Sequence, residues 1–436
     1  MLPFKVNLCS NYPGISRCIR IKLLDETGGE NVVHDRERVE QLQQLLKDWN
    51  PERACPFHDD EGENGKQCQY DAQGQLVLLH LCGQRLSHLP SEVWHCIALK
   101  KLYLAYNSVR KLPAEVGKLI HLQWLNLRKN QLTALPSELF RLTTLERLDL
   151  SSNQLGNLPA EVERLTRLRL LNLNENQLTT LPAELFNLPV LEVLELRRNQ
   201  LTPLSSEIGK LSRLRYLNLG ENQFTTIPAE IFNLTTLEHL DLYNNQFGRS
   251  TFPPEMKQLI ALQSLDLRGN GLRTLPAEVG SLTTLQSLYL DDNQFQTLPE
   301  GVVRLITLHY LSVNGCQLRT LPAELGNLTG LHSLELADNQ LSTLPEEIGK
   351  LTVLRRLDLQ NNQILFLPRE IGKLSALQAL FLDNNQLRTL PKEICEITTL
   401  RILSLNNNPM RSLPAEVGKL SSLRGLEWQP HQNNEP

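Results

Sequence analysis

Residues 122–136 read Leu-Gln-Trp-Leu-Asn-Leu-Arg-Lys-Asn-Gln-Leu-Thr-Ala-Leu-Pro, and variants of this stretch recur along most of the chain. Its second Asn belongs to a regular series. Successive members are 23 residues apart, except for one step of 25 residues after Asn245 and a Cys in place of Asn at Cys316. The members are Asn107, Asn130, Asn153, Asn176, Asn199, Asn222, Asn245, Asn270, Asn293, Asn339, Asn362, Asn385 and Asn408. A fixed period of this length predicts a solenoid built from one coil per repeat.

The order of residues within one repeat explains why Leu and Asn both recur. Leu125 and Leu127 alternate with Asn126 and Arg128, which is the pattern of a short strand with one apolar face. One repeat cannot bury its own leucines, so stacked neighbours must form a continuous core under a parallel sheet. The Asn after each strand is then expected to turn inward, where its amide bonds the backbone of adjacent coils. We interpret the Asn series as a structural ladder.

The other half of the repeat has the form Leu-Pro-Ala-Glu-Val-Gly-Ser-Leu, as at residues 275–282. Proline suits the first position of a helical turn, and the Gly is expected to limit its length. The phrase Leu-Pro-x-Glu-Ile-Gly-x-Leu resembles the repeats of plant intracellular Ras-group and bacterial leucine-rich repeat proteins. The expected α/β fold is a right-handed, horseshoe-shaped leucine-rich repeat solenoid of about 15 repeats over residues 76–428. It would have a parallel concave sheet and short helical or 3-10 turns on the convex side.

Charge and hydropathy exclude some classes of function. The 436 residues carry a net charge of −4, and residues 1–75 hold 9 Lys and Arg against 13 Asp and Glu. The array is therefore neutral, and no basic stripe marks a surface for nucleic acid or an anionic membrane. No stretch has the length of a membrane span, and the first residues lack the apolar run of a secretory signal. We expect a protein that is cytoplasmic or delivered into a host cell, with secretion as the alternative.

The segment before the array, residues 1–75, is expected to cap its first coil. Residues 35–49 are predicted to form an amphipathic helix that ends before Pro51. Such a helix would cover leucines that the open end of a solenoid exposes. At the other end of the array, residues 429–436 read as a polar tail.

Two cysteines in this segment have three interpretations. The run Trp49-Asn50-Pro51 with Cys55 and Cys68 resembles the N-terminal cap of plant leucine-rich repeat receptors. That resemblance implies a secreted protein with Cys55 bonded to Cys68, although the loop between them is longer than in the family. The residues themselves also allow free thiols, or metal ligation together with His58 and, as further candidate ligands, His80 and Cys82.

Function is expected on the concave face, at the variable positions of the strands. Six of the eight tyrosines occupy these positions, where they should point away from the leucine core. Tyr, Trp and Arg dominate binding hot spots, although aromatic residues also favour strands in general. The predicted partner-binding set lies in the middle repeats: Tyr216, His239, Asp241, Tyr243, Asp266, Arg268, Tyr289, Asp291 and Tyr310. A secondary set lies nearer the N-terminus: Tyr103, Tyr106, Trp124 and Arg128.

The chemistry of these sets favours binding over catalysis. The interleaved carboxylates favour a protein or peptide partner with basic residues. His239 and Ser264 fall at equivalent positions of neighbouring strands, with Asp241 and Asp266 one pleat further along. A smooth sheet, however, offers no strained nucleophile turn and no oxyanion hole. We therefore expect a non-catalytic protein-interaction scaffold without a cofactor or metal, with an extracellular recognition module of the receptor-ectodomain type as the alternative.

Overall fold

The computed structural model describes residues 6–7, 20–21, 68–248 and 252–429. The predicted helix at residues 35–49, Cys55 with the loop that follows it, and all but the first residue of the predicted tail at 429–436 lie outside these ranges. The bond between Cys55 and Cys68 therefore stays a prediction. None of the helices in the described ranges has the length and apolar composition needed to cross a membrane.

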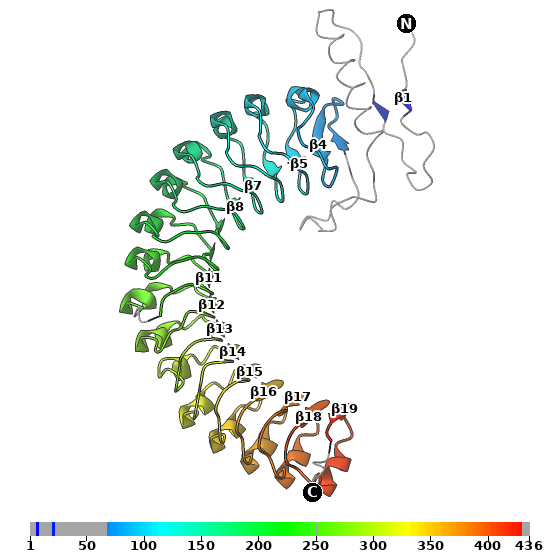
Figure 1. Ribbon diagram of the computed structural model, residues 1–436, viewed down its shortest axis with the longest axis vertical. Helices are drawn as coiled ribbons and strands as arrows, with labels where there is room; N and C mark the ends of the chain where they lie inside the picture. Colours follow the sequence, from blue (N-terminus) through cyan, green and yellow to red (C-terminus); the bar gives the residue numbers. More distant parts are fainter. Residues whose placement is uncertain (1–5, 8–19, 22–67, 249–251, 430–436) are drawn as a thin grey trace, which may run out of the picture. The chain divides into compact units, whose positions relative to one another are not determined.

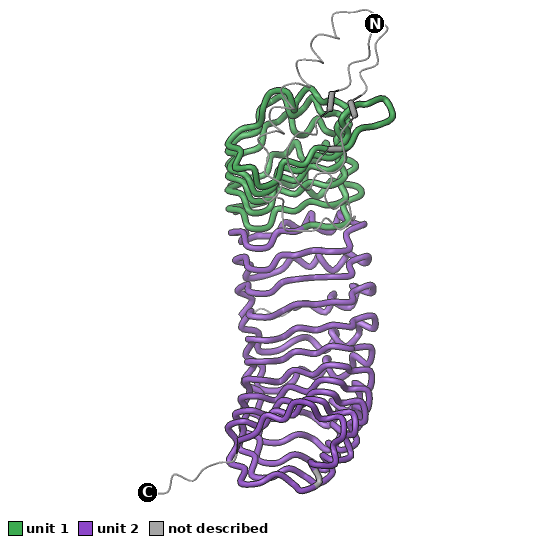
Figure 2. The backbone as a smooth tube through the Cα atoms, turned by 90° about the vertical axis from the view of Figure 1, so that its right-hand side faces the viewer, with its two compact units in different colours: residues 1–194 green, residues 195–436 purple. Residues whose placement is uncertain are grey.

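The chain divides into two compact units, residues 1–194 and residues 195–436 (Figure 2). In the first unit, β4 to β8 pair in parallel and in chain order, while β3 is antiparallel to β4. The short strands β1 and β2 form a separate antiparallel pair. The strands are β1 (Val6–Asn7), β2 (Arg20–Ile21), β3 (Cys68–Tyr70), β4 (Leu76–His80), β5 (Lys101–Tyr103), β6 (Trp124–Asn126), β7 (Arg147–Asp149) and β8 (Leu170–Asn172), with β9 (Val193–Glu195) at the unit boundary.

In the second unit, strands β10 to β19 lie side by side in chain order, all parallel (Figure 1). The register places the central Leu of each strand beside the central Leu of the next, as with Leu240 and Leu265. The predicted parallel sheet is confirmed. The strands are β10 (Tyr216–Asn218), β11 (His239–Asp241), β12 (Ser264–Asp266), β13 (Ser287–Tyr289), β14 (Tyr310–Ser312), β15 (Ser333–Glu335), β16 (Arg356–Asp358), β17 (Ala379–Phe381), β18 (Ile402–Ser404) and β19 (Gly425–Glu427).

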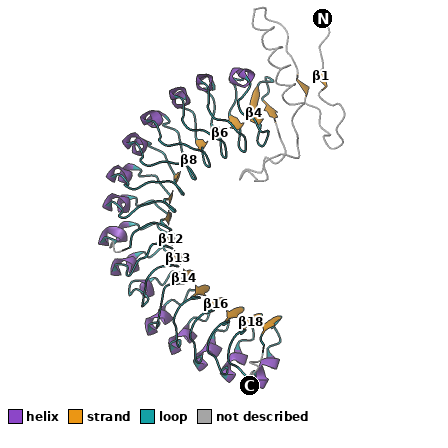
Figure 3. Ribbon diagram, viewed as in Figure 1, coloured by secondary structure: helices purple, strands orange, loops and turns teal. Residues whose placement is uncertain are grey.

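A 3-10 helix lies on the far side of nearly every coil from its strand (Figure 3). The first unit has η2 (Ser91–His95), η3 (Ala114–Lys118), η4 (Ser137–Arg141), η5 (Ala160–Arg164) and η6 (Ala183–Asn187). The second has η7 (Ser206–Lys210), η8 (Ala229–Asn233), η9 (Pro254–Gln258), η10 (Ala277–Ser281), η11 (Val302–Arg304), η12 (Ala323–Asn327), η13 (Glu346–Lys350), η14 (Arg369–Lys373), η15 (Lys392–Glu396) and η16 (Ala415–Lys419). The predicted solenoid with short 3-10 turns is confirmed.

The expected roles of Pro and Gly in these turns need correction. Pro276 precedes η10 with φ −63° and ψ 148°, so it ends the extended segment and does not begin the helix. The φ that the ring imposes suits both conformations. A Cβ on Gly349 would lie 2.7 Å from the carbonyl oxygen of Glu370 in the next coil. This Gly is therefore required for the close approach of two coils, whereas its expected role was to limit the helix.

The Asn ladder forms inside the coils as predicted. The side-chain Nδ2 of Asn222 donates to the carbonyl oxygens of Leu196 at 2.9 Å, Leu219 at 3.0 Å and Gly220 at 3.1 Å. Its Oδ1 accepts from the backbone N–H of Leu201 at 3.2 Å. One buried amide thus satisfies backbone groups of its own coil and of the coil before it.

The rung at Cys316 is incomplete. The Cys316 thiol donates to the carbonyl oxygen of Leu290 at 3.1 Å, and burial raises its pKa to about 12. The thiol sulfur is only a weak acceptor. It is bonded by the backbone N–H of Asn293, whereas the oxygen of Asn293 itself, one rung earlier, takes the N–H groups of both Asn270 and Leu272. Leu272, one repeat earlier, donates its N–H to Asn293 at 2.9 Å. Within the described residues, the N–H of Phe295 at the equivalent position has no such acceptor.

Replacing Asn222 with Ala should lower the free energy of unfolding by about 1–3 kcal/mol, because buried backbone groups lose their partners. Asn233→Ala is the matched control, since Asn233 is an exposed residue of η8 in the same unit as Asn222. It should cost less than about 0.5 kcal/mol. Urea unfolding followed by circular dichroism measures the free energy of unfolding of both variants. Equal decreases would show that the buried hydrogen bonds of the Asn ladder stabilise the fold no more than an exposed Asn does.

The reverse change, Cys316→Asn, should restore the missing acceptor for Phe295. We expect it to raise the free energy of unfolding by about 0.5–1.5 kcal/mol in the same measurement. Cys316→Ala distinguishes this gain from the removal of a thiol, because it supplies no acceptor and should not stabilise the protein.

Candidate functional site

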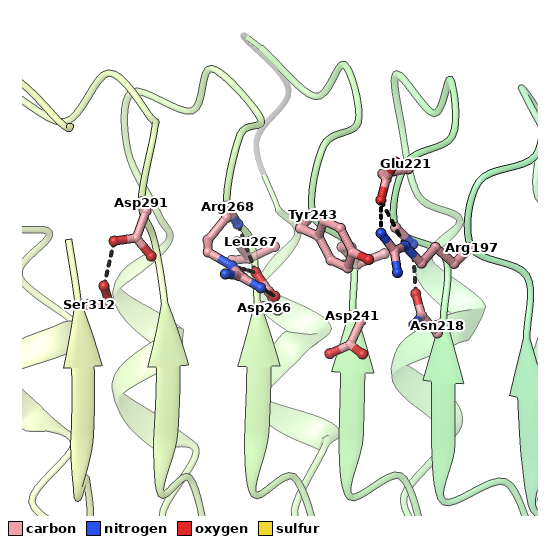
Figure 4. A network of polar contacts seen from close by, with 12 residues as sticks. Arg197, Asn218, Glu221, Asp241, Tyr243, Asp266, Leu267, Arg268, Asp291 and Ser312 are labelled. Atoms are coloured by element: carbon pink, nitrogen blue, oxygen red, sulfur yellow. Dashed lines mark hydrogen bonds and ion pairs between the residues drawn. The ribbon is translucent and has the colours of Figure 1, made fainter. Parts of the chain in front are cut away.

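The strand residues on either side of each central Leu point away from the core. We call the surface formed by these residues, and by the residue two positions after each strand, the exposed sheet face. His239 and Asp241 flank the buried Leu240 in this way, and Tyr243 stands two positions after β11. All residues of the predicted partner-binding set lie on the exposed sheet face of β10 to β14 in the second unit. Figure 4 shows Arg268 beside Asp266 and Tyr243.

Arg268 is at the centre of this set. Its Nε donates to the two carboxylate oxygens of Asp266 at 2.9 and 3.0 Å. Its guanidinium carbon lies 5.4 Å from the ring centroid of Tyr243 and 5.2 Å from that of Tyr289. The Arg268 side chain is 44% exposed, whereas that of Asp266 is 6% exposed. The carboxylate of this ion pair is therefore buried and the guanidinium is accessible to solvent. Cation–π contact on two sides holds the guanidinium in place.

Aromatic contacts continue on both sides of Arg268. The rings of Tyr289 and Tyr310 on adjacent strands have centroids 4.9 Å apart. The rings of Tyr216 and His239 lie 5.7 Å apart. The Tyr216 hydroxyl donates to Asp241 at 2.7 Å, and burial raises the pKa of Asp241 above its ordinary range.

An ion-pair network that sequence reasoning missed lies beside Tyr243. Glu221 accepts from Arg197 Nε at 2.7 Å and from Arg198 Nε at 2.9 Å. Partial burial would raise the pKa of Glu221, but the hydrogen bonds from Arg197 and Arg198 lower it. The guanidinium of Arg197 lies 5.7 Å from the Tyr243 ring, and that ring covers Gly220, where a Cβ would overlap it. The sequence signal that could have predicted this network is the spacing of about one repeat between Glu221 and the opposite charges of Arg197 and Arg198.

The carboxylates of the set are already engaged within the chain. Asp266 is bound by Arg268 and Asp241 by Tyr216. Asp291 accepts hydrogen bonds from the Ser312 hydroxyl and, at 2.9 Å, from the backbone N–H of Asn314. The expected preference for a basic partner stays a prediction.

The secondary set differs from expectation at Tyr103. Its side chain is only 4% exposed and belongs to a buried cluster with Leu78, Cys82 and Ala105. The ring centroids of His80 and Trp124 lie 5.2 and 5.1 Å from that of Tyr103. His80 stands directly opposite Tyr103 in β4, whereas Trp124 reaches it diagonally from β6. The expectation that Tyr103 is exposed was therefore wrong.

Other members of the secondary set are only partly buried. Arg147 lies over the Trp124 ring at 4.8 Å and Lys129 over the Tyr106 ring at 4.9 Å. Arg128 lies 6.0 Å from the Tyr106 ring.

The Ser, His and Asp residues considered for catalysis lie in register on neighbouring strands, but the two Asp side chains are bonded to other residues. His239 pairs with Ser264, and Asp241 with Asp266. However, the two carboxylates bind Tyr216 and Arg268. This arrangement does not provide the His–Asp bond that orients the base of a catalytic triad.

The repeats of this chain match a known protein family. A family model for the leucine-rich repeat region matches residues 74–168, 152–266, 253–360 and 345–435. No curated protein matches the chain significantly. Among solved structures, a leucine-rich repeat protein of Leptospira interrogans shares 39% identity, covering 80% of this chain and 95% of that chain, with a TM-score of 0.70.

The ectodomain of one receptor kinase from Arabidopsis thaliana and a second Arabidopsis receptor kinase are also similar to this chain. That of GASSHO1/SCHENGEN3, solved with CASPARIAN STRIP INTEGRITY FACTOR 2, shares 30% identity over 80% of this chain but only 46% of its own length, with a TM-score of 0.62. The receptor kinase HAESA, solved with the peptide hormone IDA and the co-receptor SERK1, shares 25% identity over 89% of this chain and 76% of that chain, with a TM-score of 0.62.

The raised pKa of Asp241 predicts the effect of Asp241→Asn on stability. A carboxyl group with a higher pKa in the folded state binds protons more tightly when folded. Its contribution to stability therefore falls as pH rises from the unfolded pKa, about 3.9, through the folded value. The variant keeps an acceptor for Tyr216 but lacks this titration.

We expect the urea midpoint of the variant, relative to that of the wild type, to increase as pH is raised from 4 to 7. A difference that is constant with pH, or that moves in the opposite direction, would contradict a raised pKa of Asp241.

Proposed function

Because the chain belongs to the leucine-rich repeat family, we propose that it is a non-catalytic scaffold that binds a protein or peptide partner on the exposed sheet face of its second unit. The observation that carries this proposal is the position of Arg268, held between Tyr243 and Tyr289 and bonded to Asp266. Arg and Tyr in a packed but accessible arrangement are typical of binding hot spots.

Folding does not require these large side chains. Ser287 begins β13 and Ser333 begins β15, while the same position holds Tyr216 in β10 and Tyr310 in β14. The sheet therefore forms equally well with a small polar residue there. Since the leucine core is complete without them, the aromatic residues on β10 to β14 supply contact area that the fold does not use.

The contacts among these residues also reduce the cost of binding. A flexible Arg or Tyr loses rotamer freedom when a partner immobilises it, at about 0.5–1.5 kcal/mol per side chain. Arg268 is already fixed by two rings and one carboxylate, and Tyr243 is fixed between Arg197 and Arg268. A patch spread over five strands is large enough for a standard interface of about 800 Å² per partner.

The charge of the patch supports a basic segment on the partner. The predicted set contains three Asp and one Arg, giving 1 − 3 = −2. The internal hydrogen bonds satisfy the carboxylates without removing this charge. A partner with Lys or Arg would therefore be steered toward the exposed sheet face.

The cellular location of the protein is also proposed and not shown. We favour a protein that acts in the cytoplasm or after delivery into a host cell, in signalling or host interaction. An extracellular recognition module is the second candidate, supported by the resemblance around Cys55 and Cys68 and by the two similar Arabidopsis receptors, of which HAESA was solved with a peptide hormone. Mass spectrometry of the untreated protein, showing whether Cys55 and Cys68 are bonded, separates the two.

Changing Tyr243, Tyr289 and Tyr310 together to Ala tests the proposal. A peptide display library selected on the purified chain supplies binders whose Kd can be measured by isothermal titration. The triple variant should weaken their binding by at least about 2 kcal/mol, because the aromatic contact area is lost. The leucine core is untouched, so its circular dichroism spectrum should match that of the wild type.

Phe366→Ala is the matched control, since Phe366 is a strongly exposed aromatic residue outside the strands. It should leave the Kd unchanged. If the triple variant folds and binds as tightly as the wild type, the proposed site is wrong, and Trp124→Ala then tests the secondary set in the first unit.

A further inference from the structure

Two histidines from neighbouring repeats lie side by side, each just before a strand of the second unit. His309 immediately precedes β14 and His332 immediately precedes β15. Their ring centroids are 5.0 Å apart and the rings are inclined at 73°. We propose that this pair is a surface site for one divalent transition-metal ion, with Cu²⁺ or Ni²⁺ favoured.

The backbone fixes the separation of the two side chains. The N–H of His332 donates to the carbonyl oxygen of His309 at 2.8 Å, and that of His309 donates to Gln286 at 2.8 Å. These bonds continue the parallel ladder of the strands, so the pair is anchored on the sheet and not on a mobile loop. Both side chains are at least partly exposed, and each ring is free to turn about its terminal torsion.

The fold gives no reason for histidine at these positions. The equivalent residue is Gln286 one repeat before the pair and Arg355 one repeat after it. Neither imidazole has a hydrogen bond to another residue in the part of the chain that the structure describes. Their ring nitrogens therefore stay available to a ligand from solution.

The geometry suits two nitrogens on one ion. A metal–nitrogen distance of about 2.0–2.1 Å places the centroids of two imidazoles on the same ion roughly 5 Å apart. Neutral imidazole is the ligating form.

The number of ligands selects the class of metal. The described residues hold no group of three or more His, Cys, Asp or Glu placed for a metal ion. A structural zinc site needs four protein ligands, and Ca²⁺ and Mg²⁺ prefer oxygen. Cu²⁺ and Ni²⁺ bind imidazole strongly and accept water at the remaining positions, and Cu²⁺ stands highest in the affinity series. The cation Arg355 beside the pair opposes binding, which sets a moderate affinity.

Isothermal titration of the untagged full chain with NiCl₂ tests the proposal. His309→Ala and His332→Ala should each weaken one Ni²⁺ equivalent at least tenfold. His121→Ala is the control, because His121 is exposed and has no ring contact with another His among the described residues. It should bind Ni²⁺ as the wild type does. Pulsed electron paramagnetic resonance with substoichiometric CuCl₂ should detect two imidazole nitrogens in the wild type and one in either variant.

Arg355→Gln provides a second test with the pair intact. Gln stands at the equivalent position in Gln286, so the fold tolerates it. Removing the neighbouring positive charge should tighten Ni²⁺ binding several-fold. The proposal is overturned if both Ala variants keep the stoichiometry and Kd of the wild type, or if Arg355→Gln leaves the Kd unchanged.

Discussion

The structure depends on one requirement, that the backbone groups turned inward at the end of each strand find partners where water is excluded. A leucine core cannot meet this requirement, because it offers neither donors nor acceptors. The ladder amides meet it across the boundary between coils: Asn339 Nδ2 donates to Val313 of the preceding coil at 2.8 Å and to Leu336 of its own coil at 3.1 Å. The same bonds fix the offset of one coil against the next, so the strands pair in register and the side chains of the exposed sheet face stand in aligned columns.

This arrangement separates the residues that fold the chain from the residues that are free to vary. Leucines and asparagines face inward, and nearly everything on the exposed sheet face could be replaced without loss of the core. Selection can therefore place Tyr, Arg and Asp on a rigid support whose spacing is already set. The Arg268 cluster shows the result, because its parts come from three neighbouring strands yet reach contact distance without any change in the backbone pattern.

Periodicity alone was sufficient to predict the parallel sheet, the inward asparagines and the gathering of the middle aromatic set, since position in a repeat determines the direction of Cβ. It was not sufficient for contacts made by the far ends of long side chains. Arg268 could have reached several carboxylates, and only its rotamer selects Asp266. The burial of Tyr103 depends on two neighbouring rings. The Glu221 network required reading pairs across repeats, and the approach of Gly349 to the next coil depends on coil spacing that no single repeat reveals.

The incomplete rung at Cys316 affects how uniformly the second unit resists opening. In a repeat protein, each coil is stabilised mainly by its two neighbours, so a weak junction lowers the local cost of opening without weakening distant coils. The junction without an amide acceptor at Phe295 lies between β13 and β14, and the Tyr289–Tyr310 pair spans the same two strands. The aromatic contact of the proposed site therefore spans a junction that opens at a lower energetic cost than a junction with a complete Asn rung.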